Sequence, residues 1–194
     1  MAIPRIPSHA TSYDLGRAFT EVSASSAGGA PFLIAYGATF LLTAVVSFFV
    51  PKPTAALIAM FQGGLALPLA FWLERRLGTG RMEPGNPLKA LSIQMAISQG
   101  LALPLLILVY SMNPGGIPLA MAALGGVHFL PYAWLHRTRL YTALAFTIAL
   151  GAFGLQLSLG ASAFSYILLF VALAYAVTAP LVYRHAANLV LAAT

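Results

Sequence analysis

His128 and Tyr132 stand four residues apart in an apolar stretch, so a helix would place both side chains on one face. The imidazole titrates near neutral pH, and it can donate a proton, accept one, or hold a ligand through one nitrogen. Amide side chains occur in two other apolar stretches, with Gln62 in one and Gln94 and Gln99 in the other. We take these five residues as a candidate polar pathway or pocket.

Hydrogen bonding between helices is the competing interpretation of this polar set. Such bonds hold transmembrane helices together for under about 1 kcal/mol each, and a bond from His128 to Gln94 or Gln99 would be an example. A titratable residue inside a membrane is a functional candidate in its own right. For His128 both interpretations therefore stay open.

Other kinds of chemistry lack the residues that they need. The chain has no cysteine, its histidines do not show the spacing of metal ligands, and its apolar stretches contain no carboxylate. The run Gly78-Thr79-Gly80 is not followed by the lysine of a phosphate loop. We therefore expect no catalytic residues, no metal and no cofactor, and we expect His136 and His185 at the membrane interface.

The composition is that of a membrane protein. Hydrophobic residues make up 60% of the chain and charged residues 7%, and the mean hydropathy is +0.87. A soluble domain carries roughly 25% charged residues. The net charge of +6 is spread over short loops, without a basic stripe and exposed aromatics, so nucleic acid is not an expected partner. The expected partner is the lipid bilayer.

Six apolar segments divide the chain, each near the roughly 20 residues that cross the hydrocarbon core. They are residues 31–50, 54–73, 88–110, 117–135, 138–159 and 162–183. This pattern predicts an all-α polytopic membrane protein with six transmembrane helices in three hairpins. Residues 1–30 form a cytoplasmic N-terminal segment, residues 31–185 the bundle, and residues 186–194 a short tail.

The distribution of Lys and Arg predicts the orientation. With the N-terminus inside the cell, only Lys52 lies outside. The residues on the inner side are then Arg5, Arg17, Arg75, Arg76, Arg81, Lys89, Arg137, Arg139 and Arg184. Positive charge is retained on the cytoplasmic side, so we predict a multi-pass protein of the cell (inner or plasma) membrane with both termini inside.

A short amphipathic helix is expected within residues 1–30. Residues 11–14, Thr-Ser-Tyr-Asp, have the form of a capping box, with a hydroxyl three residues before a carboxylate. Apolar residues then recur at helical spacing, at Leu15, Ala18, Phe19 and Val22. The helix either lies at the cytoplasmic interface of the membrane or packs on the end of the bundle.

Three pairs of small residues have a spacing that allows helices to approach closely. The pairs are Ala59 and Gly63, Ala122 and Gly126, and Ala145 and Ala149. They predict a compact bundle and are compatible with a homo-oligomer.

One hexapeptide, Gly-Leu-Ala-Leu-Pro-Leu, occurs twice, at residues 64–69 and 100–105. The two copies lie on predicted spans of opposite direction. We interpret the identity as chance.

Residues 125–135, Gly-Gly-Val-His-Phe-Leu-Pro-Tyr-Ala-Trp-Leu, resemble a signature of a family of small bacterial six-helix membrane proteins, a domain of unknown function. That family also shows a Glu-Arg end to its second span, as at residues 74–76, and an Asn-Pro-Leu start to its third, as at residues 86–88. The resemblance implies the six-helix architecture. It implies no activity, because the family has no assigned function.

Three functions are compatible with these features. The leading one is a small permease or channel for a neutral or weakly polar solute, lined by the polar set above. The second is a membrane enzyme or a cofactor- or lipid-binding protein that uses His128 as base or ligand. The third is a structural or regulatory bundle whose partners bind the cytoplasmic loop 74–89.

Overall fold

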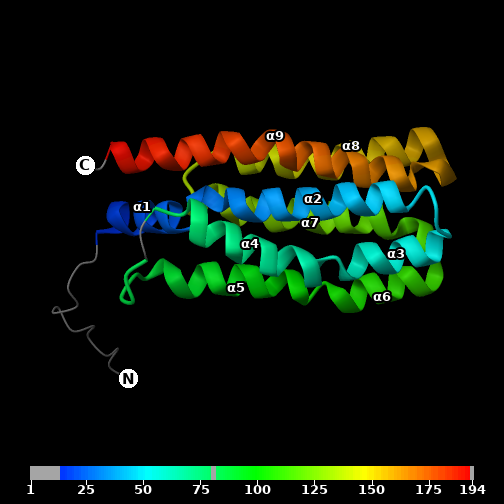
Figure 1. Ribbon diagram of the computed structural model, residues 1–194, viewed down its shortest axis with the longest axis horizontal. Helices are drawn as coiled ribbons and strands as arrows, with labels where there is room; N and C mark the ends of the chain where they lie inside the picture. The colour runs from blue at the N-terminus through cyan, green and yellow to red at the C-terminus, as the bar shows by residue number, and fades with distance from the viewer. Residues whose placement is uncertain (1–13, 80–81, 193–194) are drawn as a thin grey trace, which may run out of the picture.

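All regular structure in the computed structural model is helical over the described residues, 14–79 and 82–192. The helices lie along one long axis (Figure 1). They are α1 (Leu15–Ser25), α2 (Ala30–Val46), α3 (Lys52–Phe61), α4 (Gly63–Leu77), α5 (Leu88–Gly100), α6 (Leu103–Met112), α7 (Ile117–Leu135), α8 (Leu140–Leu159) and α9 (Ala163–Leu191). Short 3-10 turns precede α2, α7 and α9: η1 (Ala27–Gly29), η2 (Pro114–Gly116) and η3 (Gly160–Ser162). The predicted all-α fold is confirmed for this part of the chain.

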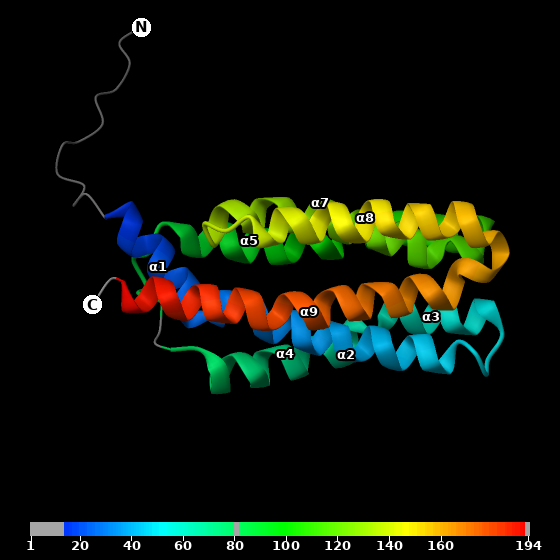
Figure 2. The same ribbon diagram turned by 90° about the horizontal axis from the view of Figure 1, so that it is seen from above.

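Five helical stretches of the described chain are long and apolar enough to cross a membrane. They are Ala27–Val46, Lys52–Leu77, Leu88–Met112, Pro114–Leu135 and Leu140–Leu191. The last stretch has 52 residues and contains both α8 and α9, which pack on each other after the chain reverses at η3. Figure 2 shows α2, α4 and α9 on one side of the bundle and α5, α7 and α8 on the other.

The observed helices follow the predicted segments closely at some points and depart from them at others. Helix α7 has the predicted bounds, 117–135. Helix α9 continues to Leu191, so most of the segment predicted as a tail is helical. Segments 54–73 and 88–110 were each expected as one helix, and each is interrupted, giving α3 and α4 in the first and α5 and α6 in the second.

Both interruptions have a local cause. Gln62 forms a turn between α3 and α4, where two glycines follow it and Pro68 stands within α4. Residues 101 and 102 form the second turn, directly before the proline at the start of α6. Glycine has a low helix propensity, and proline removes an amide donor and crowds the carbonyl four residues earlier.

Each interruption lies near one copy of the repeated hexapeptide. One copy, 64–69, begins two residues after Gln62, and the other, 100–105, contains the second turn. Figure 1 shows the two junctions, α3–α4 and α5–α6, at a similar level along the bundle. The turns fall at different positions relative to the two copies, before the first and inside the second, so nothing here contradicts the interpretation of the identity as chance.

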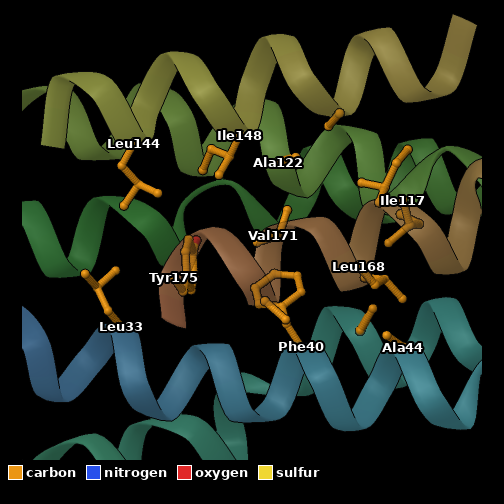
Figure 3. Close-up of a cluster of buried hydrophobic side chains, with 14 of the residues drawn as sticks. Leu33, Phe40, Ala44, Ile117, Ala122, Leu144, Ile148, Leu168, Val171 and Tyr175 are labelled. Atoms are coloured by element: carbon orange, nitrogen blue, oxygen red, sulfur yellow. The ribbon is translucent and has the colours of Figure 1, made fainter. Parts of the chain in front are cut away.

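The core is built around α9, which packs against both α2 and α8 (Figure 3). Phe40 of α2 makes an edge-to-face contact with Tyr175 of α9, with ring centroids 5.7 Å apart. A Cβ added at Gly126 of α7 would lie 2.8 Å from the carbonyl oxygen of Ala145 and 2.9 Å from the Cβ of Ala149. The close approach predicted from these small residues is therefore confirmed for α7 and α8.

Basic residues gather at one end of the bundle. In Figure 1 the helices and turns that carry Arg17, Arg75, Arg76, Lys89, Arg137, Arg139 and Arg184 meet at the end of the bundle where α1 and the last turns of α9 lie. Lys52, at the start of α3, lies at the opposite end. Arg5 and Arg81 fall outside the described residues. The asymmetry expected from the sequence is thus present among the described Lys and Arg residues.

Helix α1 packs on the basic end of the bundle. Its residues Ala18 and Val22 are buried, and the ring of Phe19 stands edge-to-face on Trp134 of α7, with centroids 4.9 Å apart. Asp14 is the N-cap of α1, and its carboxylate accepts a hydrogen bond of 2.8 Å from the amide of Gly16. The capping box predicted at 11–14 would place Asp14 at the third position inside the helix. This prediction is wrong, because Asp14 is the N-cap itself. Thr11 lies outside the described residues.

Candidate functional site

The rings of His128 and Tyr132 lie on the same face of α7, as their spacing predicts, with centroids 5.1 Å apart. Both side chains are half-buried. Tyr132 packs against the main core and also against the smaller core cluster formed by α1, α5 and the end of α7. Neither side chain makes a hydrogen bond within the described residues, so the imidazole and the phenol keep their polar atoms free for another group.

Two further tyrosines reach the same region from other helices. The Tyr36 phenol of α2 is close enough to the phenols of Tyr132 and of Tyr175 on α9 to interact with them electrostatically. The Tyr36 hydroxyl oxygen would be 3.3 Å from a Cβ added at Gly63, which places it beside the α3–α4 junction. We call Tyr36, His128, Tyr132 and Tyr175 the central polar cluster. Neither Tyr36 nor Tyr175 is among the five residues that the sequence singles out.

Gln62 is the buried amide at the α3–α4 junction. It is 5% exposed, and in the described structure neither its Nε2 nor its Oε1 atom has a hydrogen-bond partner. The next residue, Gly63, is the one beside the Tyr36 hydroxyl. A buried amide without a partner costs roughly 1–3 kcal/mol in proteins. Gln62 is therefore a polar group that the fold keeps buried at the α3–α4 junction at a cost in stability.

Gln94 and Gln99 occupy a different position from the other candidate residues. Both lie on α5, where both are exposed, and the structure records no hydrogen bond between either amide and His128. Helix α5 is mostly exposed along its length, with Leu88 and Met95 as its buried residues. The structure thus brings His128 and Tyr132 together, and Tyr36 connects them to the α3–α4 junction that contains Gln62. It leaves the two α5 amides on the surface.

His136 lies at the C-cap of α7, at the basic end of the bundle, and its side chain is buried in the protein. It is 3% exposed, and its Nδ1 atom lies 3.1 Å from the Ser23 hydroxyl oxygen. Nε2 of His185 donates a hydrogen bond of 3.2 Å to the His136 carbonyl oxygen. Burial, together with the neighbouring His185, lowers the pKa of His136 to about 4. No local sequence pattern predicts the burial of His136, because a residue that covers it, Ser23, belongs to α1 and is 113 positions away in the chain.

A stack of rings connects His136 to the central polar cluster. The His136 and Tyr132 rings are stacked with centroids 6.0 Å apart, and Tyr141 of α8 lies 5.5 Å from His136. The Tyr141 hydroxyl donates a hydrogen bond of 2.5 Å to the carbonyl oxygen of Gly28 in η1. Gly28 has a φ of +65°, which suits glycine, and its carbonyl is thereby satisfied inside the bundle. These contacts hold the part of the cluster that lies nearest to the basic end of the bundle.

The loop 74–89, where it is described, is held by α1 of the same chain. Arg17 forms ion pairs with Glu21 and with Glu83. The Asn86 side-chain amide donates to the Ala18 carbonyl at 3.1 Å and to a Glu21 carboxylate oxygen at 3.0 Å. These polar contacts add to the apolar packing of Ala18, Val22 and Phe19 in holding α1 on the end of the bundle.

The fold and the site together define an all-helical protein with helices apolar and long enough to cross a membrane. Among the described residues, no three His, Asp or Glu side chains gather as metal ligands would. The chain belongs to the family of unknown function DUF7010, whose model matches residues 16–185. Neither the curated proteins nor the solved structures contain a match.

Proposed function

We propose that this protein is a six-span integral membrane protein with both termini in the cytoplasm, and that it is a small permease for a neutral or weakly polar solute. Helices α8 and α9 are 20 and 29 residues long and run in opposite directions after η3. Each is long enough to cross the roughly 30 Å hydrocarbon core, so the fifth apolar stretch supplies two spans.

The gathering of Arg and Lys at one end of the bundle supports the proposed orientation. Cytoplasmic loops carry an excess of these residues, and only Lys52 lies at the other end of the described chain. The proposal puts the basic end, with α1 and both termini, on the cytoplasmic side. Helix α1 then lies at the inner membrane interface.

The single observation that carries the transport proposal is the unpaired amide of Gln62. It is buried at the turn between two apolar helices, and the next residue, Gly63, is the one that faces the Tyr36 hydroxyl. Interrupted helices at the level of a binding site are a common device of membrane transporters, because the break frees polar groups for the solute. Gln62, Tyr36, His128 and Tyr132 form the proposed binding site.

The chemistry of this site favours a neutral solute. An amide, two phenols and an imidazole donate and accept hydrogen bonds, and no carboxylate or ammonium lies in the apolar part of the described helices near them. A charged solute would need a counter-charge in so apolar a surrounding. Small alcohols, amides and ureas fit these requirements.

Flux through proteoliposomes tests the proposal. Vesicles with the purified protein should swell faster than empty vesicles in at least one of glycerol, urea, acetamide and a pentose. Gln62→Met, which removes the amide at similar volume, should lower that rate severalfold. The matched control is Gln156→Met in α8, whose Nε2 donates to the Gly160 carbonyl at the far end of the bundle. Rates equal to those of empty vesicles for every solute would overturn the permease, and unchanged flux in Gln62→Met would overturn the site.

A further inference from the structure

A cleft of about 590 Å³ lies at the basic end of the bundle, between α1 and the turn that joins α7 to α8. Phe19 lines it from α1, Trp134 from α7, and Arg137, Thr138 and Arg139 from the turn. It is separate from the proposed solute site.

The cleft presents two guanidinium groups. Neither Arg137 nor Arg139 forms an ion pair within the described residues, where the ion pairs are those of Arg17. Asp14, next to the cleft in the chain, uses its carboxylate to cap α1 at the Gly16 amide. The Arg137 guanidinium lies over the Phe19 ring, 5.6 Å from its centroid. The cleft therefore has an excess of positive charge and an aromatic wall.

Arg137 holds a backbone position at which glycine is the usual residue. Its φ is +50°, and it directly follows the last residues of α7. The Arg137 amide donates to the Trp134 carbonyl at 3.1 Å and the Thr138 amide to the Ala133 carbonyl at 2.9 Å. This is the Schellman pattern, in which the left-handed residue is commonly glycine. A non-glycine residue in a left-handed backbone conformation indicates that its side chain has a function, which here is that of the Arg137 guanidinium.

The surroundings of the cleft point to a lipid rather than a free ion. Trp134 is exposed at 58%, and indole rings beside arginines are typical of the membrane interface. Thr142 lines the cleft on α8, and exposed Phe146 and Leu150 follow it at steps of four residues on the same helix face. An acyl chain could lie along that face while its headgroup stays in the cleft.

We propose that this cleft binds the phosphate of an anionic phospholipid from the leaflet at the basic end. The guanidinium groups of Arg137 and Arg139 take the phosphate oxygens, since a planar guanidinium matches a phosphate with two parallel hydrogen bonds. The hydroxyl of Thr142 lies in reach of the same headgroup. Trp134 covers the glycerol region, and the acyl chains run along α8.

Lipid binding to the detergent-purified protein tests this by native mass spectrometry with short-chain phosphatidylglycerol and phosphatidylcholine. The wild type should bind phosphatidylglycerol about tenfold or more tightly than phosphatidylcholine. The double variant Arg137→Gly, Arg139→Gln should lose this preference, and glycine suits the φ of residue 137, so the turn is kept. The matched control is Lys89→Gln, a charge removal at the same end but outside the cleft, which should keep the preference.

Three results would overturn the proposal. The first is an equal affinity of the wild type for the two lipids. The second is an unchanged preference in the double variant with a normal unfolding temperature. The third is displacement of phosphatidylglycerol by about 10 mM inorganic phosphate, which would make the cleft a site for free anions.

Discussion

The Ser23 hydroxyl and the His136 imidazole lie 3.1 Å apart and join α1 to the end of α7. Both side chains are fully buried, although the two residues are 113 positions apart in the chain. The His136 ring is neutral in the folded protein near pH 7, because burial and His185 lower its pKa to about 4. This contact makes the docking of α1 sensitive to protonation.

Acidification should therefore destabilise the fold through His136. In the unfolded chain the imidazole takes up a proton as the pH falls below 6.5, while in the folded protein it stays neutral down to about pH 4. The stability due to this group is present above pH 6.5 and is lost as the pH falls to 4, by at most about 1.4 kcal/mol per pH unit. The unfolding temperature in detergent, measured at pH 7.5 and 5.0, should drop less for His136→Gln than for the wild type. An equal drop in both would contradict this role.

The hydroxyl of Tyr141 should contribute to stability through its hydrogen bond to Gly28. Tyr141→Phe leaves a buried carbonyl without its donor, and we expect a loss of roughly 1–3 kcal/mol. The control is Tyr166→Phe on α9, because Tyr166 is exposed and makes no hydrogen bond within the described residues. Urea or thermal unfolding of both variants in detergent measures the difference. If the free energy of unfolding falls equally in the two variants, the hydrogen bond to Gly28 does not account for the loss.

Two glycines of the α7–α8 hairpin should respond to alanine in opposite directions. A Cβ at Gly126 meets the backbone of α8, so Gly126→Ala forces the helices apart and should cost about 1–3 kcal/mol. A Cβ at Gly154 meets no atom within 4 Å, so Gly154→Ala should stabilise α8 by up to about 1 kcal/mol. Unfolding temperatures of the two variants check the sign. A stabilising Gly126→Ala would show that the hairpin is looser than described.

The absence of cysteine makes the proposed orientation easy to test. Single variants Lys52→Cys and Lys89→Cys sit at opposite ends of the bundle and have no competing thiol. On intact cells a membrane-impermeant maleimide should label Lys52→Cys and spare Lys89→Cys, and both should react after lysis. The reverse pattern would invert the orientation, and labelling of both in intact cells would refute the single span proposed between residues 52 and 89.

The sequence predicted what depends on local composition and could not predict what depends on distant neighbours. The bounds of α7 follow from glycines and a proline before it and a basic turn after it. The burial of His136 depends on Ser23, which no local pattern reveals. The turn at Gln62 was missed because the two glycines that follow it are tolerated inside a helix.

Gln94 offers a direct comparison between the site expected from the sequence and the one that the structure supports. The amide of Gln94 is exposed on α5, whereas that of Gln62 is buried at the α3–α4 junction. We expect Gln94→Met to leave the solute flux of proteoliposomes within about twofold of the wild type, while Gln62→Met lowers it further. A loss of flux in Gln94→Met as large as that in Gln62→Met would extend the site to α5.

Substitution of Gln62 should change stability and solute flux in opposite directions. Its amide is buried without a partner, so Gln62→Met replaces an unsatisfied polar group by an apolar one of similar size. We expect the variant to be more stable by about 1 kcal/mol, and at the same time to conduct less solute, since binding sites often keep groups that are unfavourable for the fold. Unfolding in detergent and flux in vesicles are measured on one preparation. A variant that is less stable would show that Gln62 has a structural partner, and the low flux would then follow from damage to the fold.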